Sequence, residues 1–159
     1  GTLDGTQPRD RPTVSCGVFG ETSGRVGGRV VIDIEALLTT YLNAETDERI
    51  VGEIPSDTGS AWVKVTLLDG RDQTRPADYL TNFLVQFDCY AGTNGPTGQG
   101  EAQAIAADVR GFLLAMPSET FVDAVVTNVV VRGPRRIPDT EFKPARQRFI
   151  LEAEIDVHS

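Results

Sequence analysis

The glycines that follow Tyr90 are the first residues whose spacing could serve a chemical purpose. Gly95, Gly98 and Gly100 lie between a predicted strand and a predicted helix, where backbone N–H groups can bind a phosphate. Their spacing, G-x-x-G-x-G, reverses the dinucleotide-binding order, and no Gly-Lys-Ser/Thr of a P-loop follows. Glu101 also places a negative charge where the phosphate would bind. We interpret the loop as a connector, with a small nucleotide-binding module as an alternative.

Three carboxylates near the carboxyl end could ligate a metal or exchange protons. Glu152, Glu154 and Asp156 alternate along one predicted strand, so their side chains share one face of it. The same alternation is typical of a strand whose outer face is solvated, and we adopt that interpretation.

Histidine and cysteine offer no catalytic arrangement. His158 is the only histidine, and it lies one residue from the end of the sequence without the orienting partner that triads and metal sites require. The two cysteines, Cys16 and Cys89, suit neither a disulfide framework nor a zinc site, and Cys89 is expected to be a buried small hydrophobe. We expect no enzymatic activity, no cofactor and no metal.

A strand and a helix flank the glycine loop and predict the core. The strand Thr81–Tyr90 alternates apolar and polar residues, and the helix Gly100–Met116 carries an apolar stripe that can cover its apolar face. Trp62 and Tyr90 are expected on the opposite face, as exposed aromatics that contact another subunit. The core-facing residues are Phe83, Val85, Phe87 and Cys89 on the strand, and Ala102, Ile105, Ala106, Val109, Phe112 and Leu113 on the helix.

The remaining elements predict an α+β fold: a mostly antiparallel β-sheet with two helices packed on one face. Asp33 is expected to cap a helix that runs to about Asn43. The segment Arg135–Ala145 is basic and punctuated by proline, and is expected to be irregular. The other predicted strands are Ile50–Ile54, Ala61–Leu68, Phe121–Arg132 and Arg148–Val157.

Length and composition favour one globular domain. The chain has 159 residues, of which 40% are hydrophobic and 24% charged, and no apolar run approaches the roughly 20 residues of a membrane span. Residues 1–32 are rich in glycine and are expected to form a flexible N-terminal arm, whereas residues 33–159 form a single α+β domain.

The net charge of −8 argues against general nucleic-acid binding, but the charge is unevenly distributed. Seven acids and one base lie between Asp33 and Asp57, and six bases and two acids lie between Arg132 and Arg148. These segments either form two separately solvated surfaces or meet across a subunit boundary. The subunit-interface candidates are Glu45, Asp47 and Glu48 on the acidic side, and Arg132, Arg135, Arg136 and Lys143 on the basic side.

The order of four segments resembles a known family. Asp33-Ile-Glu-Ala-Leu-Leu-Thr-Thr-Tyr-Leu42 is followed by Trp62-Val-Lys-Val-Thr-Leu-Leu-Asp-Gly70, Val85-Gln-Phe-Asp-Cys-Tyr-Ala91 and Glu101-Ala-Gln-Ala-Ile-Ala-Ala-Asp-Val-Arg110. This order is similar to that of the tail terminator (tail completion) proteins of long-tailed bacteriophages, especially those that infect actinobacteria. The resemblance covers the chain from about Asp33 onward, and residues 1–32 depart from the family's pattern.

The resemblance implies a structural virion protein that forms a hexameric ring at the head-proximal end of the tail tube. Such a ring stops tube growth and docks the head-completion or connector protein, while genomic DNA passes through its lumen without specific binding. It implies location in the tail–neck region of the virion, and in the host cytoplasm during assembly. A neck or head-completion adaptor ring is the alternative within the same class. In a ring, Glu152, Glu154 and Asp156 are lumen-facing candidates.

Overall fold

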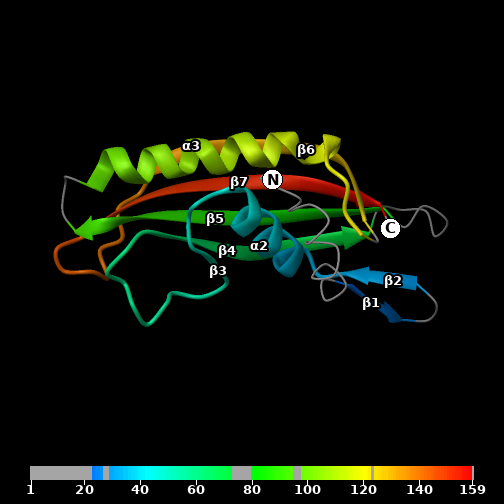
Figure 1. The fold of residues 1–159 in the computed structure, drawn as a ribbon, viewed down its shortest axis with the longest axis horizontal. Helices are drawn as coiled ribbons and strands as arrows, with labels where there is room; N and C mark the ends of the chain where they lie inside the picture. Colours follow the sequence, from blue (N-terminus) through cyan, green and yellow to red (C-terminus); the bar gives the residue numbers. More distant parts are fainter. Residues whose placement is uncertain (1–22, 27–28, 73–79, 95–97, 123, 159) are drawn as a thin grey trace, which may run out of the picture.

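Five strands form one sheet in the order β3-β4-β5-β7-β6, with two helices on one face (Figure 1). The computed structural model describes residues 23–26, 29–72, 80–94, 98–122 and 124–158. Only the β3–β4 pair is parallel, so the predicted α+β class and mostly antiparallel sheet are confirmed. The strands are β3 (Ile50–Val51), β4 (Trp62–Asp72), β5 (Leu80–Asn94), β6 (Val125–Arg136) and β7 (Arg146–His158).

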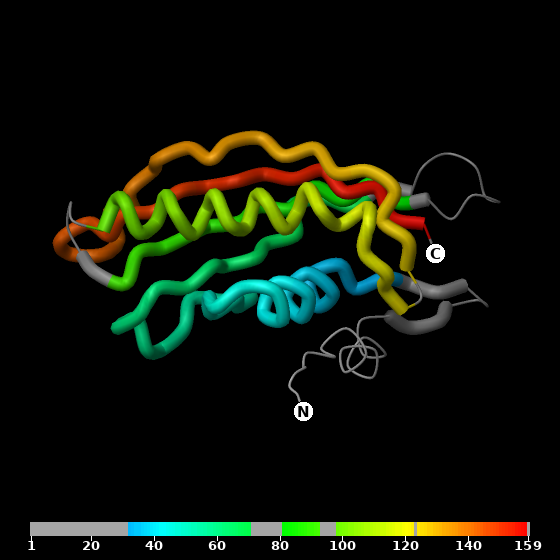
Figure 2. The backbone as a smooth tube through the Cα atoms, turned by 45° about the horizontal axis from the view of Figure 1, so that its top comes forward, coloured from blue at the N-terminus to red at the C-terminus, as the bar shows by residue number. Residues whose placement is uncertain are grey.

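Both helices pack on the same side of the sheet. Helix α2 (Ile34–Glu45) begins after Asp33, whose Oδ1 accepts a hydrogen bond from Ala36 N at 3.1 Å, as the sequence predicted. Helix α3 (Gln99–Ala115) continues into a short 3₁₀ turn, η3 (Met116–Ser118). Helix α2 packs on β3 and β4, whereas α3 lies along β5, β7 and β6 (Figure 2). The Tyr41 hydroxyl donates to Phe112 O at 2.9 Å and joins the two helices.

The core lies between the helices and the sheet. Alternate residues of β5 and β7 face the helices and are buried, which confirms the predicted alternation. Cys89 is fully buried among them, and this burial raises the pKa of its thiol well above the usual range, so the cysteine remains a neutral hydrophobic side chain.

The extents of β6 and β3 differ from the sequence predictions. Strand β6 begins at Val125 instead of Phe121 and continues through Gly133–Pro134 to Arg136, because these two residues lie in a register shift of an edge strand, where a proline is tolerated. Gly133 has a φ of +94°, and a Cβ there would lie 2.8 Å from Ile150 O, so only glycine fits this bulge. Strand β3 ends at Val51 instead of Ile54.

A hairpin lies inside the segment predicted to be a flexible arm. Strand β1 (Ser23–Val26) pairs antiparallel with β2 (Arg29–Ile32), forming a two-stranded sheet separate from the main one. Cys16 and the rest of residues 1–22 lie outside the described residues.

Candidate functional site

The sheet face opposite the helices, which we call the open face, carries the three carboxylates of β7. Glu152, Glu154 and Asp156 are half-buried and alternate with core residues, so they share this face. Glu154 Oε2 accepts from Arg132 Nη2 of β6 at 2.7 Å, and Asp156 Oδ1 accepts from Asn82 Nδ2 of β5 at 2.7 Å. Among the described residues, no three His, Cys, Asp or Glu side chains are grouped as a metal site requires.

Cross-strand rows set the charge of the open face. Paired residues of neighbouring strands point to the same side, so the register identifies which charges share this face. Among the residues whose side chains the structure describes, it carries five carboxylates and three bases outside the covered end described next, and the Arg132–Glu154 ion pair neutralises one of each. The face is therefore acidic by a small excess. Its charged residues are Asp69, Asp88, Glu152, Glu154 and Asp156, with Lys64, Arg132 and Arg135.

One end of the open face is covered by an aromatic cluster, which we define as Trp62, Tyr90 and Phe142. The rings of Trp62 and Tyr90 stack with centroids 4.4 Å apart, and Phe142 lies 6.0 Å and 6.1 Å from them. Trp62 is 0% exposed and Tyr90 is 1% exposed. The prediction that these two residues are exposed aromatics is wrong, because the connection between β6 and β7 folds back over them.

An arginine fixes this connection from within the cluster. Arg146 Nη1 donates to Thr58 O at 2.7 Å and to Ala91 O at 3.1 Å. Its guanidinium lies 5.1 Å from the Trp62 ring centroid and 5.0 Å from that of Phe142, within cation–π range. One buried arginine thus joins the segment before β4, the end of β5 and the β6–β7 connection.

A buried aspartate, Asp139, is a second residue that holds the β6–β7 connection against the sheet. Asp139 Oδ2 accepts from the Tyr90 hydroxyl at 2.9 Å, and Asp139 Oδ1 accepts from Glu141 N at 3.0 Å. Arg148 Nη1 lies 3.8 Å from Asp139 Oδ2, and Arg148 Nε donates to Ile137 O at 2.9 Å. Burial, followed by the bond to Asp139, raises the pKa of Tyr90 to about 12, so its hydroxyl stays a proton donor at neutral pH.

Sequence reasoning missed Phe142 as a residue of the aromatic cluster, and Asp139 and Arg146 as the residues that fix the β6–β7 connection beside it. The segment contains several prolines and charges, which favoured an exposed irregular connection. Phe142 was the available signal, because it is the one aromatic residue in a polar connection and can anchor that connection by packing back onto the sheet.

The acidic interface candidates lie at the end of α2 and in the turn between α2 and β3, and they do not all face outward. Asp47 is exposed, whereas Glu45 and Glu48 are half-buried. Burial first, then the charges of Glu101 and Asp108 on α3 and of neighbouring Asp47, raise the pKa of Glu48. The carboxyl of Glu48 is therefore influenced by the acidic residues of α3 in its own subunit.

Replacing Glu48 by glutamine should stabilise the fold slightly at neutral pH. The folded pKa of Glu48 lies above its ordinary value of 4.5, so ionisation favours the unfolded chain. The gain, about 0.5 kcal/mol after solvent screening, should be complete at pH 7 and disappear below about pH 4.5, where the wild-type carboxyl is also protonated. Urea unfolding at pH 7 and pH 4 measures it. Asp47→Asn is the matched control, and an equal gain in that variant would contradict the interpretation.

The basic candidates, except Lys143, lie on β6, at the edge of the sheet opposite to β3 and the acidic candidates. Arg135 and Arg136 are exposed at the end of β6, where Arg136 Nε donates to Gln147 Oε1 at 3.0 Å. Arg132 is on the same strand, in its ion pair with Glu154. Lys143 instead follows Phe142 at the covered end of the sheet. The acidic candidates and the three arginines are thus at opposite edges of the sheet and do not meet within one subunit.

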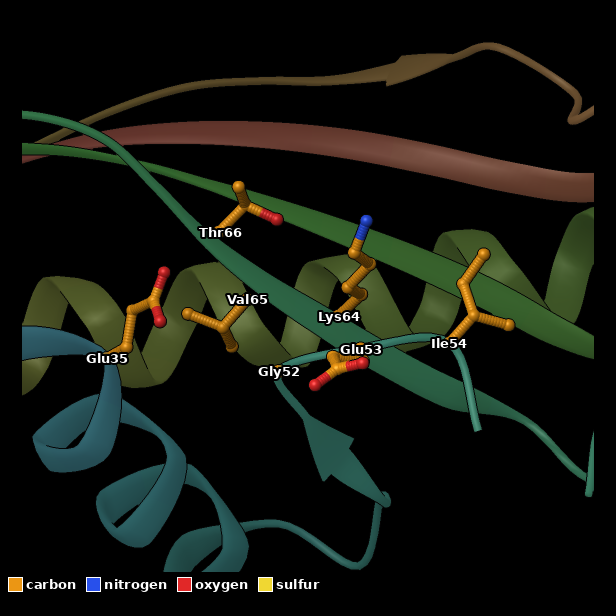
Figure 3. Close-up of a pocket in the computed structure, with 7 residues that line it drawn as sticks. All are labelled: Glu35, Gly52, Glu53, Ile54, Lys64, Val65 and Thr66. Atoms are coloured by element: carbon orange, nitrogen blue, oxygen red, sulfur yellow. The ribbon is translucent and has the colours of Figure 1, made fainter. Parts of the chain in front are cut away.

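A pocket opens where β3 separates from β4 (Figure 3). Its volume is about 460 Å³, and Figure 3 shows Glu53 and Ile54 beside Lys64 and Val65 of β4. Glu35 of α2 also lines it, and its Oε2 accepts from Leu67 N at 2.7 Å. A side chain, rather than a strand, therefore satisfies this N–H on the edge of β4. The complete lining is Glu35, Gly52, Glu53, Ile54, Lys64, Val65 and Thr66.

A carboxylate joins the two segments that flank the glycine loop. Glu101 Oε1 accepts from Gly92 N at 2.8 Å, which joins the first turn of α3 to the end of β5. Gly95 lies outside the described residues. The contact places a negative side chain near the helix end where a phosphate would need to bind.

Two further observations bear on function. Within the described ranges, no helix combines the length and the apolar character that crossing a bilayer requires. Comparison of the chain with protein-family models and with curated proteins found no match.

Proposed function

We propose that the chain is a tail terminator, a structural protein that forms a ring, ends growth of the phage tail tube and joins the tail to the head-completion or connector protein. The observation that carries this proposal is the open face. One side of the sheet is covered by both helices, whereas the other carries Glu152, Glu154 and Asp156 along the interior strand β7. If the helices face outward in a ring, these carboxylates line the channel and repel DNA phosphates, so DNA passes without binding.

The separation of charge supports a head-to-tail ring. A heterologous interface requires two different and complementary patches on one subunit. Here the acidic residues beside β3 and β4 lie across the sheet from the arginines of β6. In two copies placed side by side, the acidic region of one subunit would face the arginines of the next.

Reversing the charges of Arg135 and Arg136 should weaken ring formation. Arg135→Glu/Arg136→Glu replaces attraction with repulsion at each boundary, and we expect about tenfold weaker association per interface, or about 1.4 kcal/mol, at low salt. Light scattering across a concentration series measures the effect. Arg110→Glu on the exposed side of α3 is the control and should assemble normally. Assembly of the double variant at wild-type concentrations would count against the charged boundary.

The test of the function itself is the mass in solution, followed by binding to isolated tail tubes. We expect a mass of six subunits that falls as salt rises. A terminator binds the end of a tail tube, whereas the adaptor ring that is its rival binds the portal side of the neck. Binding to neither structure would overturn the proposal, and a thermal shift with nucleotides would favour the nucleotide-binding alternative.

A further inference from the structure

Strand β6 lies at one edge of the main sheet. It pairs with β7 on one side, and among the described residues no strand lies on its other side. The stretch that can accept a further strand runs from Val125 to Arg132, because the register shift at Gly133–Pro134, where proline has no N–H, interrupts the edge beyond it. An unpaired strand edge is a template for pairing with another segment.

This edge has little protection against such pairing. Charges, prolines and bulges commonly block exposed edges, but Asn128–Arg132 contains no proline or bulge, and its single charge is the Arg132 guanidinium that binds Glu154. Apolar side chains are exposed instead, since Val125 is 58% and Val130 46% exposed on the open face. A strand added here would cover both valines.

The amino-terminal segment joins the fold at the opposite side of the sheet. Helix α2 packs on β3 and β4, and near its start Glu35 accepts a hydrogen bond from Leu67 N of β4. Strand β1 runs back along β2, so that Ser23 pairs with Ile32, and Ile32 packs against the core directly before α2. Residues 1–22 are therefore attached beside the start of α2, on the β4 side.

This attachment point lies at the height of the β6 stretch that can accept a strand. Following the pairs across β5 and β7, Leu67 is level with Val131. In the proposed ring, the β3–β4 side of one subunit faces the β6 side of the next, so the attachment point of one copy lies beside the β6 edge of its neighbour. Within one subunit, β4 and β6 are three strand spacings apart, or about 14 Å.

Residues 1–22 include one segment whose composition suits an edge strand. Thr13–Phe19 reads Thr-Val-Ser-Cys-Gly-Val-Phe, and four of its seven residues are β-branched or aromatic. Fully extended, it spans about 23 Å, close to the length of the eight-residue stretch of β6. The chain from Phe19 to Ser23 reaches at most about 13 Å. This is enough for an adjoining edge, but too short for a path around the sheet to the subunit's own β6.

We propose that Thr13–Phe19 of one copy adds as a strand to the β6 edge of the next copy, at Val125–Arg132. This inference rests on the proposed ring and names the segment that links its subunits. The added strand provides main-chain hydrogen bonds across each boundary, which supply affinity in strand-addition complexes. Every subunit gives one segment and receives one, so the exchange closes with the ring.

Cysteine cross-linking tests the exchange, because Cys16 lies within the segment and Cys89 is buried. Wild-type protein provides Cys16, and Cys16→Ser/Val130→Cys provides only the edge. The two are mixed at high salt, returned to low salt and treated with a short bis-maleimide, which reaches facing Cβ atoms about 4.5–5.5 Å apart and diagonal ones about 7–8 Å apart. Cys16→Ser/Val125→Cys covers the other end of the stretch, so a different register moves the cross-link to this variant.

We expect a covalent dimer from the mixture and none from either protein alone. Cys16→Ser/Leu114→Cys, with its thiol at an exposed position on α3, replaces the edge variant as a control and should give no dimer. Val14→Asp/Val18→Asp in the protein that provides Cys16 keeps the length of the segment but places charges in the added strand, and should lower the dimer yield at least tenfold. Leu3→Asp, outside the segment, should leave the yield unchanged.

The outcomes separate this inference from the proposed function. Rings of normal mass without a cross-link in either mixture would overturn the exchange but leave the ring intact. A cross-link within single chains that carry both Cys16 and Val130→Cys, without one in the mixture, would show that the segment covers its own edge, which also overturns the exchange. An unchanged yield with Val14→Asp/Val18→Asp would mean proximity without strand pairing and would overturn it as well. A monomer at every concentration, without cross-links between copies, would overturn both proposals.

Discussion

Trp62→Ala should lower the free energy of unfolding by about 3–5 kcal/mol, the range for truncating a large buried aromatic. Trp62 is fully buried, stacks on Tyr90 at 4.4 Å and supports the Arg146 guanidinium. The truncated side chain leaves a cavity beneath the β6–β7 connection and removes one face of the arginine's contact. Urea unfolding followed by circular dichroism measures the loss.

Ile54→Ala is the matched control for Trp62→Ala. Ile54 is apolar but 47% exposed, so its truncation should change the free energy of unfolding by no more than about 0.5 kcal/mol. A loss below 1 kcal/mol for Trp62→Ala would mean that the aromatic cluster contributes little to folding and that the connection is held by its hydrogen bonds alone.

Asp139→Ala should be the second most damaging substitution, with an expected loss of about 2–4 kcal/mol. It removes the acceptor of the Tyr90 hydroxyl and of Glu141 N, and leaves Arg148 without its nearby carboxylate. A buried polar group left without its partner destabilises by about 1–3 kcal/mol, and an unpaired charge by more. Thermal and urea unfolding at neutral pH measure the effect.

Two variants separate the contributions of Asp139. Asp139→Asn keeps oxygen and amide groups for hydrogen bonding but removes the charge, so it should lose about half as much as alanine. Combining Asp139→Ala with Tyr90→Phe should give a loss smaller than the sum of the single losses, with a coupling of about 0.5–3 kcal/mol. Strict additivity would contradict a direct contact between the two side chains.

The sequence predicts the layered core well because that core depends on local periodicity. The alternation of Phe83, Val85 and Phe87 required one apolar face, and the stripe of α3 offered the matching surface. The cap at Asp33 followed from the same kind of short-range rule. These patterns are complete within a single segment.

The surfaces were harder to predict because they depend on contacts between distant segments. The burial of Trp62 and Tyr90 comes from Phe142 and Asp139, which are far away in sequence. Arg146 was assigned to a basic surface, although its guanidinium is inside the cluster and bound to two carbonyl groups. Charge type alone does not show which arginines are used internally.

The extents of the two edge strands also could not be predicted from local sequence patterns. Gly133–Pro134 resembles a break in sequence, yet β6 continues through it because β6 is an edge strand among the described strands, and an edge tolerates a proline. The segment after Val51 has strand-like composition, but it departs from β4 and opens the pocket beside Glu35. The extents of β6 and β3 depend on which strands lie beside them, and the order of strands in the sheet cannot be read from a single segment.

The length of the two interior strands has a mechanical consequence. Strands β5 (15 residues) and β7 (13 residues) pair along nearly their whole length, and β7 is also bonded to β6 on its other side. Because the hydrogen bonds run perpendicular to the strands, a pull along β7 loads both ladders at once in shear and cannot open them one bond at a time. The sheet is therefore stiffest along its strands and yields most readily at its outer edges.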